Sequence, residues 1–213
     1  MTNKIKIIPP SIDHESLISF NESMFANEAV IKNYVIENIT LFQKEYRLLK
    51  FDYCTFKNVI FESCSLEKFE AINCIFDNCE FSNSFFNESI FSKVEFNNCK
   101  ITGAQFPDSN FSDFLFNGCQ GSLITSRYSY LKYGKFIDCK LNLADFTSSK
   151  FNNVIFIKCD LTESVFSNCS FNSVDLAKSD IEKASFSLNS LSGVTISYEQ
   201  SHIFAKLLGL RIV

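Results

Sequence analysis

The sequence contains no tryptophan and only two histidines, His14 and His202, both near its ends. Histidine is the side chain most often used as a metal ligand and as a general acid or base. The chain also has no Gly-rich phosphate loop and no nucleophile–base arrangement. We therefore expect no catalytic site, no bound metal and no cofactor, and the protein is predicted not to be an enzyme.

Long apolar runs are also missing. No stretch approaches the ~18 consecutive apolar residues of a membrane span. The apolar run Ile5–Ile8 is too short for a secretion signal, and two prolines follow it at once. Nine cysteines without such a signal indicate reduced thiols in a cytoplasmic protein. The net charge of −4 disfavours direct binding to nucleic acid, which normally needs a basic surface.

Phenylalanine is abundant, with 25 residues, and its spacing is regular. Between Phe51 and Ile196, 27 of the 30 positions whose numbers end in 1 or 6 hold Phe, Leu or Ile, the exceptions being Ala71, Gly121 and Ser126. All nine cysteines lie two places before such a position, where Ser, Ala and Val also gather. None of the 17 acidic and 12 basic residues in this range occupies either class of position.

A period of five fits neither an α-helix, which repeats every 3.6 residues, nor a flat strand, which repeats every two. It requires a unit that turns after every five residues, so that four units close a square coil of twenty. Large residues then fill the centre, small ones sit beside them, and Asn and Ser suit the turns. The cysteines that are twenty residues apart should form a ladder that serves packing: Cys79, Cys99, Cys119, Cys139 and Cys159.

The repeating unit resembles that of the pentapeptide-repeat family: a small residue, a polar residue, Leu or Phe, and two more polar residues. Residues 144–148 (ADFTS) and 104–108 (AQFPD) match this unit directly. The resemblance implies an all-β fold, a right-handed quadrilateral β-helix. We expect an N-terminal cap over 1–30 and a β-helix over 31–196 that is regular from residue 51.

The C-terminal segment, residues 197–213, departs from the repeat. Ser197 and Gln200 have the spacing of a capping box, which predicts a short helix that ends near Leu208 and Gly209. A short strand is expected over 210–213. This segment is similar to the C-terminus of Qnr-type quinolone-resistance proteins, a resemblance that implies a homodimer, binding to DNA gyrase or topoisomerase IV, mimicry of duplex DNA and protection from quinolones. The implied dimer interface consists of Tyr198, Ile203, Phe204, Leu207, Leu208, Leu210 and Ile212. The alternative is an apolar lid on a monomer.

Two surface features remain open. The outward acids Glu62, Glu80, Asp160, Asp180 and Glu182 share one predicted face, opposed there by Lys100 and Lys140, and they form either a partner-binding stripe or an ordinary solvated face. The stretch 127–135 (RYSYLKYGK) is basic and aromatic without an acid. It is either a contact patch for an acidic partner or a repeat imperfection in which tyrosines cover a thin core. The alternative function is a scaffold for an unrelated protein.

Overall fold

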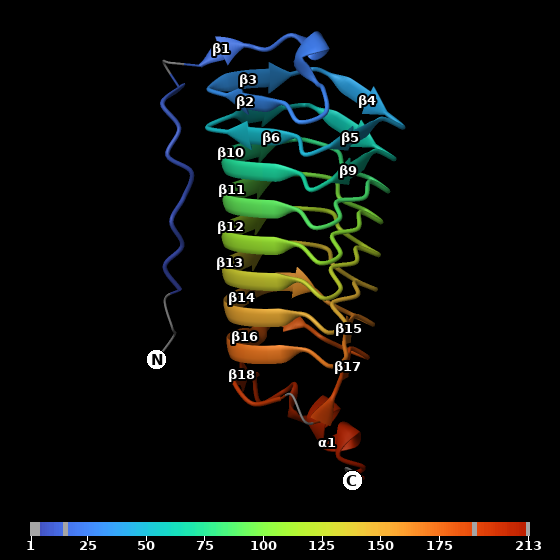
Figure 1. The fold of residues 1–213 in the computed structure, drawn as a ribbon. Helices are drawn as coiled ribbons and strands as arrows, with labels where there is room; N and C mark the ends of the chain where they lie inside the picture. The colour runs from blue at the N-terminus through green and yellow to red at the C-terminus, as the bar shows by residue number, and fades with distance from the viewer. Residues whose placement is uncertain (1–4, 15–16, 189–190, 212–213) are drawn as a thin grey trace.

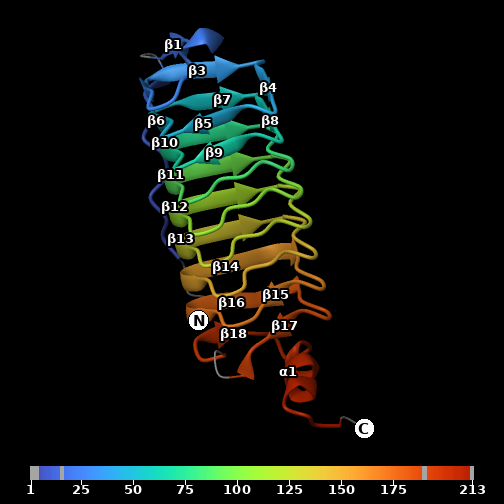
Figure 2. The same cartoon turned by 45° about the vertical axis from the view of Figure 1, so that its right-hand side comes forward.

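Residues twenty apart in the sequence lie side by side in the computed structural model, which describes residues 5–14, 17–188 and 191–211. Ala71, for example, pairs with Phe51 on one side and with Phe91 on the other, and these strand pairs are parallel. The predicted twenty-residue coil is therefore confirmed. The fold is a right-handed, four-sided β-helix with one short C-terminal helix, and it forms an elongated rod (Figures 1 and 2).

The elements follow one another along the rod axis. They are β1 (Ile18–Ser19), the 3₁₀ helix η2 (Glu22–Met24), β2 (Val30–Lys32), β3 (Tyr34–Glu37), β4 (Thr40–Phe42), β5 (Glu45–Arg47), β6 (Lys50–Asp52), β7 (Thr55–Lys57), β8 (Ile60–Glu62), β9 (Ser65–Glu67), β10 (Glu70–Asp77), β11 (Ile90–Asn97), β12 (Asn110–Asn117), β13 (Tyr130–Ile137), β14 (Lys150–Asp160), β15 (Val165–Phe166), β16 (Ser170–Asp180), β17 (Ser185–Phe186), β18 (Val194–Thr195) and α1 (Ser201–Leu207). Stacking of coils already begins at β2, which pairs with β6.

The large residues of the repeat stack on their counterparts one coil away. One column runs unbroken through six rings whose successive centroids are 4.4–5.0 Å apart, formed by Phe56, Phe76, Phe96, Phe116, Phe136 and Phe156. Each ring is at most 3% exposed. Burial of each such side chain contributes roughly 1.5–3 kcal/mol as an upper estimate. The phenylalanine stacks are therefore the main source of stability.

The small residues of the repeat satisfy the backbone at the corners. Ser84 Oγ donates to the carbonyl oxygen of Phe61 at 2.6 Å, and the backbone N–H of Cys64 donates to the same Oγ at 3.0 Å. Cys99 Sγ takes the same place and lies 3.4 Å from the carbonyl oxygen of Phe76. Serine and cysteine are both found at these positions because both are short side chains that can donate to a buried carbonyl group.

Most corners of the rod have a left-handed backbone. Among the described residues, all 29 non-glycine residues with positive φ have numbers ending in 3 or 8, and many of them are Asn, which tolerates this conformation. This finding explains why Asn is frequent in the outward positions of the repeat.

The exceptions to the core pattern are compensated locally. At Ala71 the ring of Phe69, which occupies a small-residue position, lies 5.7 Å from the rings of both Phe51 and Phe91. Around Ser126 the space is lined by Phe106, Phe146 and by Ile124, a second large residue in a small-residue position. The core therefore stays nearly continuous through the imperfect coils.

The N-terminal segment before β1 runs back along the outside of the rod (Figure 1). The backbone N–H of Ile8 donates to Asp113 Oδ1 at 2.9 Å, although the two residues are 105 positions apart. Ile5, Ile7 and Ile12 are half-buried, whereas Lys6 and Ile8 are exposed. The segment thus presents its alternate side chains to the rod. Across the described ranges, no helix is both long and apolar enough to cross a membrane.

Candidate functional site

The outer surface carries the candidate functional residues, because the interior is filled by side chains. Within residues 5–14, 17–188 and 191–211, no three His, Cys, Asp or Glu side chains are grouped to hold a metal ion. His202 Nδ1 lies 2.7 Å from the carbonyl oxygen of Glu199, and its Nε2 lies 3.4 Å from Glu182 Oε2. The cysteines are all free and buried.

The predicted acidic face is one column of stacked residues with mixed charge. Parallel bridges place Ile60, Glu80, Lys100, Gln120, Lys140 and Asp160 in register, and Asp160 pairs with Asp180. The acids at the N-terminal end of the column are therefore separated from those at the C-terminal end by two lysines. The column does not form a continuous acidic stripe.

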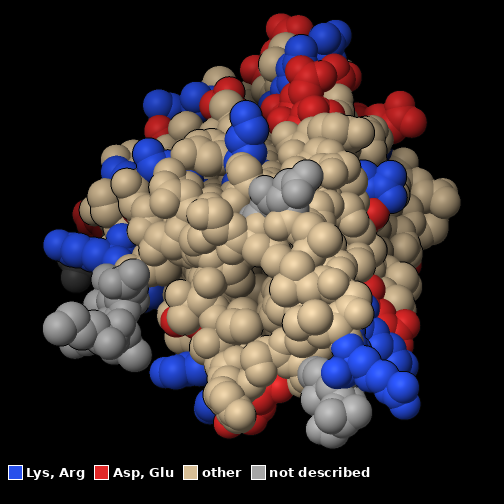
Figure 3. All heavy atoms as spheres, turned by 90° about the horizontal axis from the view of Figure 1, so that it is seen from below, with Lys and Arg blue, Asp and Glu red and all other residues tan. Residues whose placement is uncertain are grey.

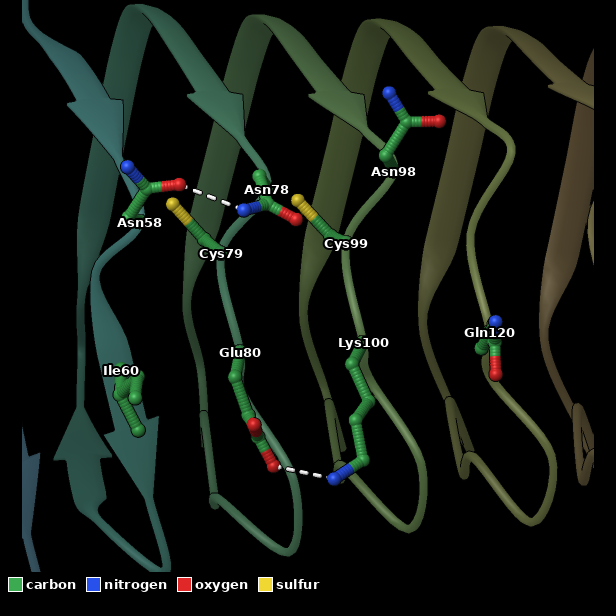
Figure 4. Close-up of a pocket in the computed structure, with 9 residues that line it drawn as sticks. All are labelled: Asn58, Ile60, Asn78, Cys79, Glu80, Asn98, Cys99, Lys100 and Gln120. Atoms are coloured by element: carbon green, nitrogen blue, oxygen red, sulfur yellow. Dashed lines mark hydrogen bonds and ion pairs between the residues drawn. The ribbon is translucent and has the colours of Figure 1, made fainter.

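At the N-terminal end of this column, Glu80 is already neutralised. Lys100 Nζ lies 2.7 Å from Glu80 Oε1, and this hydrogen bond holds the pKa of the Glu80 carboxyl below its usual range. Beside the pair, a shallow groove of about 410 Å³ runs along the corner, with Cys79 and Cys99 at its floor and Asn78 hydrogen-bonded to Asn58 on its rim (Figure 4). Glu62 lies in β8, two positions after Ile60, which lines the groove.

At the C-terminal end of the column, two acids also make local hydrogen bonds. Asp160 Oδ1 accepts from the backbone N–H and the hydroxyl of Thr162 at 3.0 and 2.7 Å. Asp180 Oδ1 accepts from the backbone N–H of Glu182 at 2.9 Å. The structure therefore brings Asp160, Asp180 and Glu182 together near the C-terminal end of the rod.

Ion pairs between successive coils are a general feature of the surface. They join residues twenty apart, as in Lys32–Asp52 at 3.3 Å, Lys50–Glu70 at 2.6 Å, Lys68–Glu88 at 3.5 Å and Lys183–Glu163 at 3.4 Å. Most of these side chains are substantially exposed, so each pair contributes little to stability. Their main consequence is that acidic side chains are locally balanced by bases.

The C-terminal segment closes the last coil through the predicted capping box. The backbone N–H of Ser197 donates to Gln200 Oε1 at 2.8 Å, and the backbone N–H of Gln200 lies 3.4 Å from Ser197 Oγ. The helix itself begins at Ser201 and ends at Leu207, and its N-cap is Gln200. The prediction of Ser197 as the N-cap is therefore wrong, because the two reciprocal bonds close a turn that precedes the helix. Gln200 Nε2 also donates to the carbonyl oxygens of Leu176 and Ser179 at 2.9 and 2.7 Å. This glutamine therefore fastens the helix to the coil beneath it.

The residues of the predicted dimer interface divide into two groups. Ile203, Phe204 and Leu207 pack against the core, with the ring of Phe204 5.1 Å from that of Phe186. Tyr198, Leu208 and Leu210 are exposed, with fractions of 89, 62 and 59%. The strand expected over 210–213 is not formed at Leu210 or Arg211, and Ile212 lies outside the described residues. Figure 3 shows this end of the rod as largely uncharged at its centre, with charged side chains toward its rim.

The basic and aromatic stretch 127–135 lies at mid-rod, and its tyrosines are at the surface. Tyr128 is 64% exposed, and Tyr130 and Tyr133 are 36% exposed. The nearby core cavity is lined by Phe, Ile, Leu and Ser side chains. The interpretation in which tyrosines cover a thin core is therefore wrong, because Ile124 performs that role from inside.

Comparisons with known proteins identify the repeat. A family model described as pentapeptide repeats matches residues 135–168, and one described as the SV2A/B/C luminal domain matches residues 18–106. No curated protein matches the chain. A trypsin-treated variant of QnrB1, a plasmid-mediated fluoroquinolone resistance protein, is similar over 92% of this chain and 96% of its own, with 19% identity and a TM-score of 0.45. HetL, a pentapeptide-repeat protein involved in heterocyst differentiation regulation in the cyanobacterium Nostoc sp. strain PCC 7120, is similar over 82 and 92%, with 13% identity and a TM-score of 0.40.

Proposed function

Because this chain is a pentapeptide-repeat protein, we propose that it is a cytoplasmic, non-enzymatic rod that binds DNA gyrase or topoisomerase IV as a mimic of duplex DNA and protects the enzyme from quinolones. The observation that carries this proposal is the C-terminal segment, residues 197–211, which resembles that of Qnr-type proteins and fastens to the last coil through Gln200. Nine free cysteines support a reducing compartment.

The dimensions of the rod support mimicry of DNA. From β2 to β16 there are seven steps between paired coils, and each step is about 4.8 Å, so this part spans roughly 34 Å. That length is about one turn of duplex DNA. Two rods joined at their C-terminal ends would span roughly twice as much, so the proposal includes a homodimer.

The exposed residues of the C-terminal end support the dimer, because a twofold contact would bury Tyr198 and Leu208 together with their symmetry copies. Replacing each of them with Asp tests the contact without touching the core. We expect the double variant to have half the mass of the wild type in light scattering while its thermal midpoint, measured at a concentration where the wild type is monomeric, stays unchanged. A variant that keeps the dimer mass would refute this contact, and a wild type that is itself monomeric would leave the lid of a monomer as the role of this segment.

The charge pattern favours a second candidate, a scaffold for an unrelated protein. About 20 phosphates line 34 Å of duplex DNA, whereas residues 51–196 carry 17 acids against 12 bases, and Glu80, Glu70 and Asp145 are each within 2.7 Å of a base. A rod with balanced charges is better suited to specific protein contacts than to imitating a polyanion.

Supercoiling of DNA by purified gyrase and relaxation of DNA by purified topoisomerase IV separate the two candidates. The topoisomerase candidate predicts inhibition of the enzyme by the protein alone and rescue of activity in the presence of ciprofloxacin, each at micromolar protein. The Tyr198→Asp, Leu208→Asp variant serves as the control for the dimer. If the protein neither inhibits the enzyme nor rescues its activity, the scaffold for an unrelated protein is the remaining candidate.

A further inference from the structure

One face of the rod at mid-length carries tyrosine and lysine side chains that the fold does not use, and we call it the tyrosine–lysine patch: Tyr128, Tyr130, Lys132, Tyr133 and Lys150. The register of β13 on β14 places Tyr130 beside Lys150 and Lys132 beside Asn152. Asn152 Nδ2 lies 3.4 Å from the hydroxyl of Tyr130. Tyr128 and Tyr133 lie at the two corners that border this face.

Two of these tyrosines are held in an unfavourable backbone conformation. Tyr128 has φ of 57° and Tyr133 has φ of 53°, a region in which bulky residues are uncommon and Asn or Gly is preferred. Neither side chain is buried in return, since they are 64 and 36% exposed. Leu123 and Leu143 share this conformation and exposure, so the corners of the rod tolerate bulky side chains. What distinguishes Tyr128 and Tyr133 is the face between them, which carries Lys132 and, from the next coil, Lys150.

The charge around the patch is positive, whereas the chain as a whole is negative. Residues 121–150 contain five bases and two acids. Both acids are in ion pairs, Asp145 with Arg127 at 2.6 Å and Asp138 with Lys158 at 3.8 Å. Among the described residues, no acid lies within 4.0 Å of the remaining lysines, which are Lys132, Lys135, Lys140 and Lys150. Lys132 Nζ instead lies 4.8 Å from the centroid of the Tyr133 ring.

We propose that the tyrosine–lysine patch is a docking surface for an acidic segment of a partner protein. Carboxylates of the segment bind Lys132 and Lys150, and its apolar side chains pack on the exposed tyrosine rings, which are among the residues that contribute most to protein interfaces. The inference goes beyond the proposed function, because it applies whether or not the partner is a topoisomerase.

A single-stranded nucleic acid is the less suitable occupant. Affinity for nucleic acid depends on the number of phosphates that bases neutralise. The patch offers two lysines, and the chain as a whole has a net charge of −4, which repels a polyanion at long range.

The test is a selection with a phage-displayed library of random 16-residue peptides on the immobilised full-length protein. The library is first passed over the Tyr128→Asn, Tyr133→Asn variant, which removes peptides that bind outside the patch. We expect the peptides that only the wild type retains to be rich in Asp and Glu with interspersed Leu, Phe or Trp. Neutral or basic peptides, or no peptide specific to the wild type, would overturn the proposal.

A selected peptide, labelled with fluorescein, then gives affinities by anisotropy. The tyrosine variant and the Lys132→Glu, Lys150→Glu variant should each bind at least about tenfold more weakly. The tyrosine variant should also have an equal or higher thermal midpoint, which a structural role for these tyrosines would not allow. Tyr53→Asn, at another left-handed corner, and Lys57→Glu are matched controls that should bind as the wild type does. Tighter binding to a 16-nucleotide oligo-dT than to the peptide would identify a nucleic-acid site and refute the inference.

Discussion

A methyl group added at Gly134 would lie 1.9 Å from Cζ of Phe114, one coil away in the same column. Phe114 is a large residue in a small-residue position, and its ring occupies the space above the glycine. Val94, Val154 and Val174 fill the equivalent positions of other coils. Phe114 and Gly134 are therefore a matched pair whose volumes offset each other.

Gly134→Ala should destabilise the protein by about 1–3 kcal/mol, because the ring of Phe114 must leave its position in a packed core. The free energy of unfolding in urea measures the effect. Phe114→Val alone should also destabilise, since it leaves a cavity. The double variant should recover most of the loss, and additive single effects would contradict the pairing.

Ser126 and Ser129 are two buried serines with opposite predicted responses to alanine. Ser126 Oγ has no hydrogen-bond partner among the described residues. Ser129 Oγ donates to the carbonyl oxygen of Phe106 at 2.7 Å and accepts from the backbone N–H of Ser109 at 3.2 Å. Because an unpaired buried hydroxyl costs free energy, Ser126→Ala should stabilise by about 1 kcal/mol, and Ser129→Ala should destabilise by about 1–3 kcal/mol. Thermal unfolding of both variants checks the contrast, which equal shifts would refute.

The period of five was sufficient to predict the coil, the inward stacks and the buried cysteines. In nearly every coil, the position of a residue within the unit of five decides whether its side chain points inward or outward. The compensating residues were missed. Three large residues occupy small-residue positions, and only their packing in the structure explains them: Phe69, Phe114 and Ile124. A signal existed in the sequence, since each large exception lies two positions before, or twenty before, a small one.

The surface was less predictable than the core. Opposite charges twenty residues apart, as in Glu80 and Lys100, follow from the period and predict the ion pairs between coils. The contact between Ile8 and Asp113 follows from no repeat, because the N-terminal segment lies outside the coils.

Gln200 should control the stability of the C-terminal coil. Its side chain is buried and bonds to Leu176, Ser179 and Ser197. Gln200→Ala leaves these backbone groups unpaired, so we expect a local loss of about 1–3 kcal/mol. Hydrogen exchange should become faster at the end of β16 and in α1 and stay unchanged in β10–β13. Ser201→Ala, at an exposed position of α1, is the control and should change neither region.

The ion pair between Glu80 and Lys100 should make a small part of the stability depend on pH. The hydrogen bond from Lys100 lowers the pKa of the Glu80 carboxyl in the folded state. A lowered pKa means that the pair stabilises the fold above the pKa of the unfolded state, and that this contribution disappears as the pH falls through the folded value. NMR titration of the Glu80 carboxyl carbon should therefore give a pKa below the ordinary range for glutamate.

Lys100→Gln should return the pKa of Glu80 toward its ordinary value and weaken the dependence of unfolding free energy on pH in the acidic range. The change in stability at neutral pH should be small, because the Lys100 side chain is 56% exposed and water screens the pair. Lys57→Gln, which removes a lysine from another face, is the matched control and should leave the titration of Glu80 unaltered. If both variants shift the pKa of Glu80 equally, the general field of the rod, and not the contact between these two coils, sets the acidity of this carboxyl.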